Sequence, residues 1–370
     1  MIAPIGKYMF LRDHLQFGLR LWFFPLGIMM VCSVNAQNES YNGFVPLDNY
    51  YGASGVALSG TNGSRSMNDV NQWGINPGIL TGTLNGEVGV NSSFYPSKIS
   101  VFSLTSVLQL DSIWPIGVRL LQTSFGETDR YDAEGRNIGT FRSSSSSISL
   151  GTSRALSQDL RIGIALNYHL RNIDSYNSHI LSVDIGSVYS LGDNSAVGLS
   201  ISNLGHEIIP FETERTPINW DLSIYGSKKL RYLPLELFLK FQKLNYWNRL
   251  SYLNPFDESQ NDFDNGGSSE SSRIENLVRE IFAHMVVGGQ MSFGKPEKFW
   301  LRFSYDHLQN RQLGIENIRS LEGIALGFGI AVKELKIDYS WERLYFDTGV
   351  HHLSLSLNIF GDKKVAPRRF

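Results

Sequence analysis

The fold class is decided by one stretch near the C-terminus, Gly349-Val350-His351-His352-Leu353-Ser354-Leu355-Ser356-Leu357-Asn358-Ile359-Phe360. Leucine or isoleucine occupies every second position from 353 to 359, and polar residues occupy the positions between them. Successive side chains of a β-strand point to opposite faces, so this pattern predicts a strand with one apolar and one polar face. The preceding segment, 335–342, repeats the pattern. Alternation alone fits a soluble β-sandwich as well as a membrane barrel.

Segments of this kind recur from Glu87 to Phe360, and they number about fourteen. Each is near or above the roughly 9–11 residues that a tilted strand needs to cross a bilayer. Charged residues make up 18% of the chain, against about a quarter in soluble proteins, as expected where one face of the wall meets lipid. The sequence therefore predicts an all-β fold, a transmembrane antiparallel β-barrel of about 14 strands over residues 87–360.

The connections between the segments favour the barrel over the sandwich. Short connections, such as Ser157–Asp159 and Gly192–Asp193, alternate with longer ones, such as Phe125–Arg142 and Asn248–Ile281. Short turns at one end and long loops at the other are typical of bacterial outer-membrane barrels. The first hairpin, near residues 95–97, departs from this rule. An even number of strands places both ends of the barrel on the periplasmic side.

The first 36 residues have the form of a secretory signal. Basic residues precede the apolar run Leu21–Val34, and Val34 and Ala36 supply small residues at the −3 and −1 positions of a cleavage site. We expect a signal peptide over 1–36 and export to the bacterial outer membrane, with a retained membrane anchor as the alternative. Cys32, the chain's single cysteine, lies in this segment, so the mature chain would hold no disulfide and no thiolate metal site.

The segment 37–86 is rich in Gly, Asn and Ser and has no hydrophobic pattern of its own. Attached to the periplasmic end of a barrel, it would fold into the lumen as a hatch or plug. Near its end lies a candidate hatch turn formed by Asn76, Pro77 and Gly78, in which the proline fixes its own φ and restricts the residue before it. At the other end of the chain, the basic segment 361–370 is predicted to be a periplasmic tail.

The longest outer loop contains an acidic, Gly/Ser-rich stretch from 257 to 272, followed by apolar residues at helical spacing from Arg273 to Ile281. This spacing predicts a short helix. Such a helix would rest on the barrel rim or meet a partner protein, and a solvated loop with one helical turn is the alternative. The candidate partner-facing residues are Arg273, Ile274, Leu277, Val278 and Arg279.

Catalytic and cofactor chemistry leaves no recognisable pattern in this sequence. It contains no Gly-x-Ser-x-Gly elbow, no phosphate-binding loop and no His-Glu-x-x-His pair. His351 and His352 are neighbours on a strand and would face opposite ways. We therefore expect no enzyme, no catalytic or metal-binding residues and no cofactor. The net charge of −2 offers no basic surface for nucleic acid. An enzyme built at the barrel rim without a diagnostic spacing remains an open third possibility.

An export signal, a plug with an Asn-Pro-Gly turn and about fourteen strands together resemble the long-chain fatty-acid outer-membrane transporter superfamily. Within it, the C-terminal region looks most like the PorQ-type outer-membrane proteins of the type IX secretion system, in the PorV/PorQ branch. The resemblance is carried by Phe299–Tyr305, Gly327–Ile330, Leu335–Tyr339 and Gly349–Leu357. The basic tail beyond Gly361 departs from this pattern.

The resemblance implies a scaffold whose chemistry is done by its partners. The expected partners are a PorZ-like extracellular protein, other type IX attachment-complex proteins and outer-membrane lipid, including lipopolysaccharide. Together they would process secreted cargo and attach it to anionic lipopolysaccharide. The alternative function is an outer-membrane transporter of long-chain fatty acids or other hydrophobic small molecules.

Overall fold

The chain divides into two compact units, Met1–Asn42 and Gly43–Phe370. The computed structural model describes residues of the second unit only. They are 52–96, 98–109, 114–213, 215–247, 270–294, 296–313, 321–344 and 348–359. The expected signal peptide, 1–36, and the expected basic tail, 361–370, lie outside the described residues.

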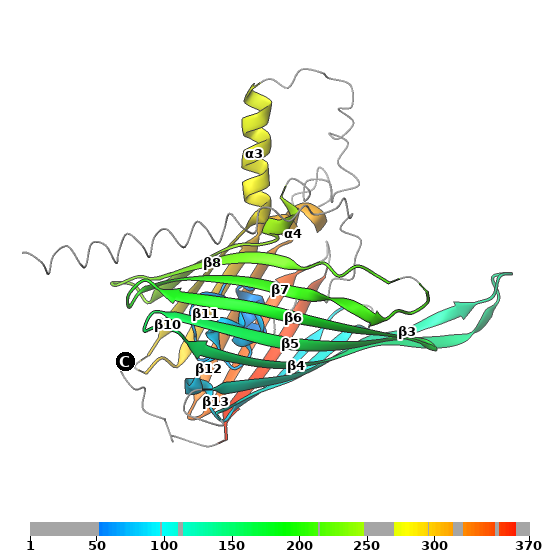
Figure 1. Ribbon diagram of the computed structural model, residues 1–370, viewed down its shortest axis with the longest axis horizontal. Coiled ribbons are helices and arrows are strands. Elements are labelled where there is room, and N and C mark those ends of the chain that lie inside the picture. The colour runs from blue at the N-terminus through cyan, green and yellow to red at the C-terminus, as the bar shows by residue number, and fades with distance from the viewer. Residues whose placement is uncertain are drawn as a thin grey trace, which may run out of the picture. The chain divides into compact units, whose positions relative to one another are not determined.

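Fourteen antiparallel strands close into a barrel in which each strand pairs with its neighbours in sequence and β1 pairs with β14 (Figure 1). The prediction of a barrel of about fourteen antiparallel strands is confirmed. The strands are β1 (Glu87–Phe94), β2 (Ser100–Gln109), β3 (Pro115–Tyr131), β4 (Asn137–Ala155), β5 (Leu160–Ile173), β6 (Tyr176–Ser190), β7 (Ser195–Ile209), β8 (Asp221–Lys229), β9 (Leu235–Phe241), β10 (Met285–Phe293), β11 (Phe299–Asp306), β12 (Ile324–Val332), β13 (Leu335–Arg343) and β14 (Gly349–Asn358).

The alternation in β14 separates the outside of the barrel from its inside. Leu353, Leu355 and Leu357 point outward and are 41–44% exposed, whereas the intervening Ser354 and Ser356 are buried in the interior. The same exposed aliphatic and aromatic face continues around the wall. An outward surface of this kind suits acyl chains, while the inward polar groups pair with one another or meet water. In the described part of the chain, no helix has the length and apolarity needed to cross a membrane.

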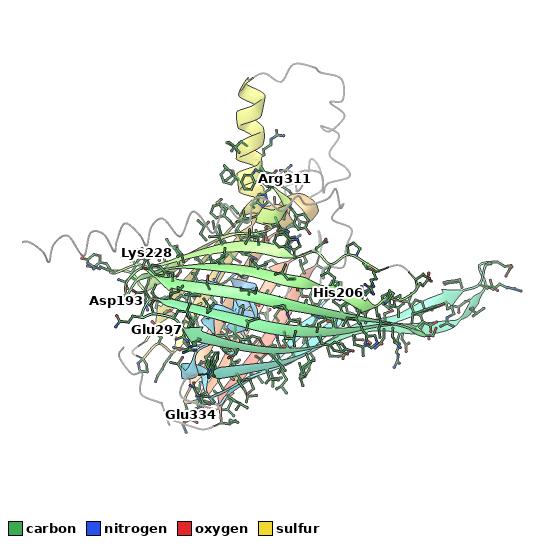
Figure 2. All side chains as sticks on the ribbon, viewed as in Figure 1. Asp193, His206, Lys228, Glu297, Arg311 and Glu334 are labelled. Carbon is green, nitrogen blue, oxygen red and sulfur yellow. The ribbon has the colours of Figure 1, made fainter. Side chains whose placement is uncertain are left out.

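The two ends of the barrel differ. Short turns join β4 to β5, β6 to β7, β8 to β9, β10 to β11 and β12 to β13 at the end where β1 begins and β14 finishes. Figure 2 shows Asp193, Lys228, Glu297 and Glu334 at this end. Because short turns face the periplasm in bacterial outer-membrane barrels, we take this end as periplasmic and the opposite end as extracellular.

The segment Phe125–Arg142 was predicted to be a loop, and that prediction is wrong. β3 and β4 continue beyond the wall as a two-stranded ribbon, with Glu127 paired to Arg142 and a turn at 132–136 (Figure 1). The register shifts between Ser124 and Glu127, where Gly126 has a φ of 79°. Both faces of the ribbon meet solvent, so both are largely polar, and the alternation that marks a half-buried strand is missing.

Helices occur before β1 and in the extracellular connections. The first group is α2 (Ala53–Ala57), η1 (Gln72–Gly74), η2 (Pro77–Ile79) and η3 (Gly82–Leu84), and the second is η4 (Leu244–Tyr246), α3 (Glu270–His284) and α4 (His307–Leu313). The helix expected over 273–281 is therefore present but longer. The helix also includes Phe282 to His284, which the sequence pattern had assigned to the following strand.

The outward position of Leu355 gives a direct test of the membrane-facing wall. We expect Leu355→Arg to lower the free energy of unfolding in lipid vesicles by about 1–4 kcal/mol, because an arginine on the lipid-facing wall loses its hydration. Guanidinium titration of the refolded barrel measures this. Ile138→Arg is the matched control, since Ile138 is also exposed but lies in the ribbon. Equal losses at the two positions would contradict a lipid-facing wall at Leu355.

Candidate functional site: the plugged lumen

Residues 52–86, here called the plug, lie against inward-facing positions of strands all around the barrel. Their apolar side chains are almost completely buried. One cluster joins Val70, Trp73, Leu80 and Leu84 of the plug to two wall residues, Val107 and Ala165. The plug has little regular structure, so its order comes from contacts with the wall rather than from a core of its own.

The Asn-Pro-Gly turn is held by the side chain of Asn76. Its Oδ1 accepts a hydrogen bond from the backbone N–H of Gly78 at 2.9 Å, which caps the short helix η2. Its Nδ2 donates to the carbonyl oxygens of Gly63 at 2.7 Å, Ser187 at 3.1 Å and Leu199 at 3.4 Å. One buried amide thus joins two parts of the plug to β6 and β7.

Three inward glycines on neighbouring strands make room for this turn. A Cβ on Gly163 of β5 would lie 2.2 Å from the carbonyl oxygen of Pro77, and one on Gly186 of β6 would lie 1.9 Å from Oδ1 of Asn76. A Cβ on Gly198 of β7 would lie 2.5 Å from the carbonyl oxygen of Gly63. Gly163 and Gly186 are also direct partners in the β5–β6 ladder. We call these three residues the glycine seat.

Trp73 occupies a second recess in the wall, formed by β3 and β4. Its ring lies over Gly117 and Gly151, where an added Cβ would approach the ring to 2.7 and 2.8 Å. The guanidinium of Arg119, an inward residue of β3, lies 4.4 Å from the ring centroid. A cation over the face of a desolvated tryptophan is attracted by about 2 kcal/mol. The arginine charge is therefore stabilised by the plug itself.

The first residues of the plug contact a different part of the wall from the Asn-Pro-Gly turn and Trp73. The backbone N–H of Ala53 donates to Oγ of Ser354 at 2.7 Å, and the hydroxyls of Ser59 and Ser304 lie 2.7 Å apart. Ala57 fills the space above Gly327, where a Cβ would lie 2.5 Å from its methyl group. Strands β11 to β14 thus hold the start of the plug, while β3 to β7 hold its end.

Charged groups complete these contacts. Lys336 donates to Glu87 at 2.7 Å and to the carbonyl oxygen of Asn68 in the plug. Arg65 of the plug approaches Glu236 of β9 to 3.7 Å. Four more charged residues of the wall are buried in the interior, namely Lys240, Arg302, Asp306 and Asp338. Inside the wall Arg302 bonds to Asp338 and, at 2.7 Å, to Gln290.

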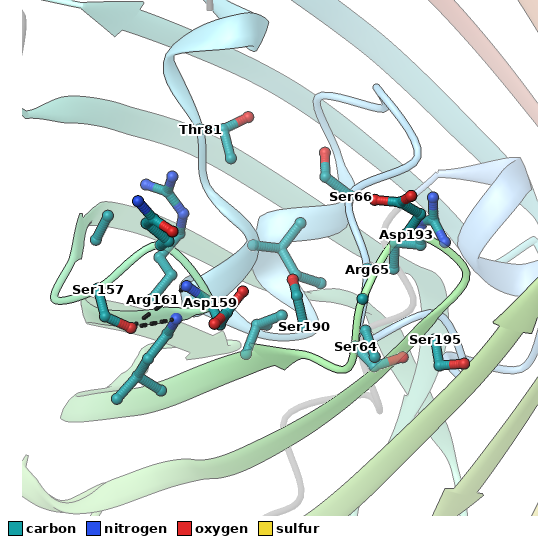
Figure 3. A pocket seen from close by; sticks show the side chains of 18 residues that line it. Ser64, Arg65, Ser66, Thr81, Ser157, Asp159, Arg161, Ser190, Asp193 and Ser195 are labelled. Atoms are coloured by element: carbon teal, nitrogen blue, oxygen red, sulfur yellow. Dashed lines mark hydrogen bonds between the residues drawn. The ribbon is translucent and has the colours of Figure 1, made fainter. Parts of the chain in front are cut away.

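A cavity of about 430 Å³ lies between the plug and the periplasmic turns (Figure 3). Ser64, Arg65 and Thr81 border it from the plug, and the β4–β5 and β6–β7 turns border it from the wall. Asp159, Arg161 and Asp193 contribute charged groups to its lining (Figure 3). The cavity suits water or a polar solute better than an acyl chain.

The structure separates the two sets of residues singled out from the sequence. Asn76, Pro77 and Gly78 lie together in the glycine seat. Arg273, Ile274, Leu277, Val278 and Arg279 all belong to α3, outside the lumen. Of these, Leu277, Val278 and Arg279 are exposed, while the side chains of Arg273 and Ile274 lie outside the described part. The seat glycines were missed, although glycine at an inward position of three successive strands was a visible signal.

No protein-family model matches the sequence, and no curated protein is significantly similar to it. Solved structures of similar fold include the Pseudomonas putida toluene transporter TodX, which is 12% identical with a TM-score of 0.44. The match covers 87% of this chain and 98% of that one. A Pseudomonas aeruginosa FadL homologue is 10% identical with a TM-score of 0.48, and the match covers 85% and 99%. Similarity of this degree assigns no family, so the PorQ-type resemblance stays a prediction.

The glycine seat predicts the effect of one added methyl group. We expect Gly186→Ala to displace the Asn-Pro-Gly turn, since overpacking costs about 1–2 kcal/mol and raises the population of displaced plug about 5- to 30-fold. The rate of trypsin cleavage after Arg65, in the refolded barrel, measures that population. Gly226→Ala is the control, because no heavy atom lies within 4 Å of an added Cβ there. Equal cleavage rates in the two variants would contradict the role of the seat.

The amide of Asn76 predicts a separate loss of stability. We expect Asn76→Ala to cost about 1–3 kcal/mol, because it leaves buried carbonyl oxygens without their donor. Asn137→Ala makes a comparable change in the exposed ribbon, where Oδ1 accepts from the N–H of Gly139 at 2.9 Å. That control should cost less than about 0.5 kcal/mol. Guanidinium titration compares the two, and similar losses would show that Asn76 is not an anchor.

Proposed function

We propose that this chain is a plugged outer-membrane barrel that anchors an extracellular protein assembly, in the role of PorQ-type barrels in type IX secretion. The observation that carries the proposal is the attachment of the plug to the wall around the whole lumen. The glycine seat, Trp73 and the Ala53–Ser354 hydrogen bond each fix it to different strands. A barrel closed in this way is suited to carrying partners rather than to passing cargo.

The chemistry of the inner wall supports this choice over transport of apolar molecules. Nδ2 of Asn167 donates to Asp184 at 2.7 Å, and Arg171 forms an ion pair with Glu207 at 2.9 Å. An apolar solute passing these side chains would separate polar groups from one another or from water without replacing their hydrogen bonds. The aliphatic and aromatic surface lies on the outside of the wall instead.

The extracellular ribbon of β3 and β4 is the surface that we assign to the protein partner. Its turn is ordered by Asp132, which accepts hydrogen bonds from the backbone N–H of Arg136 at 2.8 Å and of Glu134 at 3.1 Å. The hydrogen bond from the Arg136 backbone holds the pKa of Asp132 below its ordinary value. The carboxylate is therefore charged at neutral pH. The expected partners are a PorZ-like extracellular protein, other attachment-complex proteins and lipopolysaccharide.

Transport of long-chain fatty acids or other hydrophobic small molecules is the second candidate. The solved structures of similar fold named above include a toluene transporter and a FadL homologue. The specific observation in its favour is the open volume at the periplasmic mouth, which gives the plug room to move aside; the polar lining of this volume is not itself a site for an apolar molecule. A shift of Arg65 and Thr81 would enlarge this cavity into the lumen.

A ribbon-deletion strain distinguishes the two candidates. We replace residues 127–142 by two glycines, which removes the ribbon and leaves the closed wall intact, and compare this strain with a full gene deletion and with Gly226→Ala. If the chain is a scaffold, the ribbon-deletion strain should attach as little type IX cargo to the cell surface as the gene-deletion strain does. Its uptake of labelled fatty acid should be unchanged. Normal cargo attachment in the gene deletion, with reduced fatty-acid uptake, would overturn the scaffold and favour transport.

A further inference from the structure

The helix α3 stands outside the barrel and is amphipathic. Figure 1 shows it rising from the wall, across the direction of the strands. Leu277, Val278, Ile281 and Phe282 are 37–51% exposed. Their spacing places all four on one side of the helix, with Arg279 facing the other way and Glu280 and His284 along the edge next to Leu277. Four exposed apolar side chains on one face need an apolar neighbour.

Only the C-terminal end of α3 is fixed to the rim by described contacts. His284 is fully buried, its Nδ1 lies 2.7 Å from the carbonyl oxygen of Gln242 and its ring stacks on Trp247 at 4.7 Å. Glu280, one turn earlier, is also buried and lies 3.3 Å from Nε2 of His284. These contacts use a stripe of the helix that borders the apolar face at Leu277. The apolar face is left outward, and the helix axis runs beside the barrel rather than over its lumen.

The apolar face continues the outward surface of the wall. Phe282 meets the ring of His307 edge-on at 5.9 Å, and His307 in turn meets Tyr305 at 6.1 Å. Tyr305 is an outward residue of β11 and pairs with Val287 of β10 on the lipid-facing side. Burial and the nearby Arg311 lower the pKa of His307, so its ring is neutral at physiological pH. An uninterrupted path of uncharged rings thus leads from the wall to the helix.

We propose that α3 is an interfacial anchor that lies in the outer leaflet beside the barrel, with Leu277, Val278, Ile281 and Phe282 among the acyl chains and Arg279 on the water side. Three observations carry this: the helix lies across the strands, its apolar face is continuous with the wall that meets lipid, and His284 fixes its C-terminal end to the rim. An amphipathic helix in the plane of an interface buries its apolar face in the region where headgroups meet acyl chains. In this arrangement Leu277 and Val278, which the sequence analysis expected to face a partner, would face lipid.

The arrangement has a consequence for the scaffold. A helix lying in the leaflet and joined directly to β10 would resist rotation and tilting of the barrel while its ribbon is bound to a large extracellular assembly. The inference itself rests only on the membrane location of the barrel. It would stand if the chain proved to be a transporter.

Lipid quenching tests the anchor on the full chain. Cys32→Ser removes the natural cysteine, and single cysteines are placed by Leu277→Cys and Arg279→Cys and labelled with the fluorophore NBD. The proteins are reconstituted in phosphatidylcholine vesicles that contain a lipid with a nitroxide near the top of its acyl chain. We expect the lipid to quench the label at 277 at least three times as strongly as the label at 279, and aqueous iodide to show the reverse order.

Two controls calibrate this result. Leu326→Cys, on the outward face of β12, marks a position in lipid, and Glu134→Cys, in the ribbon turn, marks a position in water. Equal lipid quenching at 277 and 279 would overturn the anchor. So would a label at 277 that neither nitroxide lipid nor iodide reaches, because another protein surface would then cover the face.

A second variant separates insertion from folding. Phe282→Glu, combined with Val278→Cys as the labelled site, places a charge on the apolar face and leaves the strands unchanged. We expect lipid quenching at 278 to fall by at least half. The barrel should still be folded, which is shown by a change in its migration on detergent gels when the sample is heated. Unchanged quenching in a folded barrel would show that the helix does not depend on its apolar face for its position.

Discussion

The pairing of β14 with β1 is the interaction on which the rest of the structure depends. Eight residues of each strand are in register, from Glu87 opposite Asn358 to Phe94 opposite His351. Within a bilayer an unpaired strand edge would leave a row of backbone N–H and C=O groups without partners, each costing several kcal/mol. Closure removes that edge. It also creates an enclosed interior that must itself be filled or hydrated.

The filling of that interior explains the unusual use of glycine. A wall residue that faces a plug with no core of its own must accept the plug's backbone at close range. Gly163, Gly186 and Gly198 admit the Asn-Pro-Gly turn, and Gly117 and Gly151 admit the ring of Trp73. Glycine weakens a strand because it loses more conformational freedom on folding. Here the closed ladders on both sides of each glycine hold the strand, and the plug supplies the missing side-chain contacts.

Local patterns in the sequence were sufficient to predict the strands of the wall, but they were insufficient to predict the contacts between the wall and the plug. Alternation identified β14 and β13 because each has one face in lipid and one inside, whereas the ribbon beyond Ser124 escaped detection because both of its faces meet water. Asn76 and Pro77 were recognised as a turn from the geometry of proline alone. Their partners were not, because Ser187 and Leu199 lie more than a hundred positions away in the chain. Contacts at that separation leave no periodic trace in a single sequence.

The distribution of polar and apolar groups constrains what the barrel does. Charged side chains gather inside, where Lys336 and Arg302 are neutralised by Glu87 and Asp338, and the apolar surface continues outside from β11 through His307 to α3. A transporter of apolar molecules needs an apolar path through the wall or lumen. An anchor needs a stable wall and an outward apolar surface that contacts the surrounding lipid. In the proposed role of an anchor, the outward apolar surface would hold the barrel in the leaflet, while the inward hydrogen bonds hold the plug in the barrel.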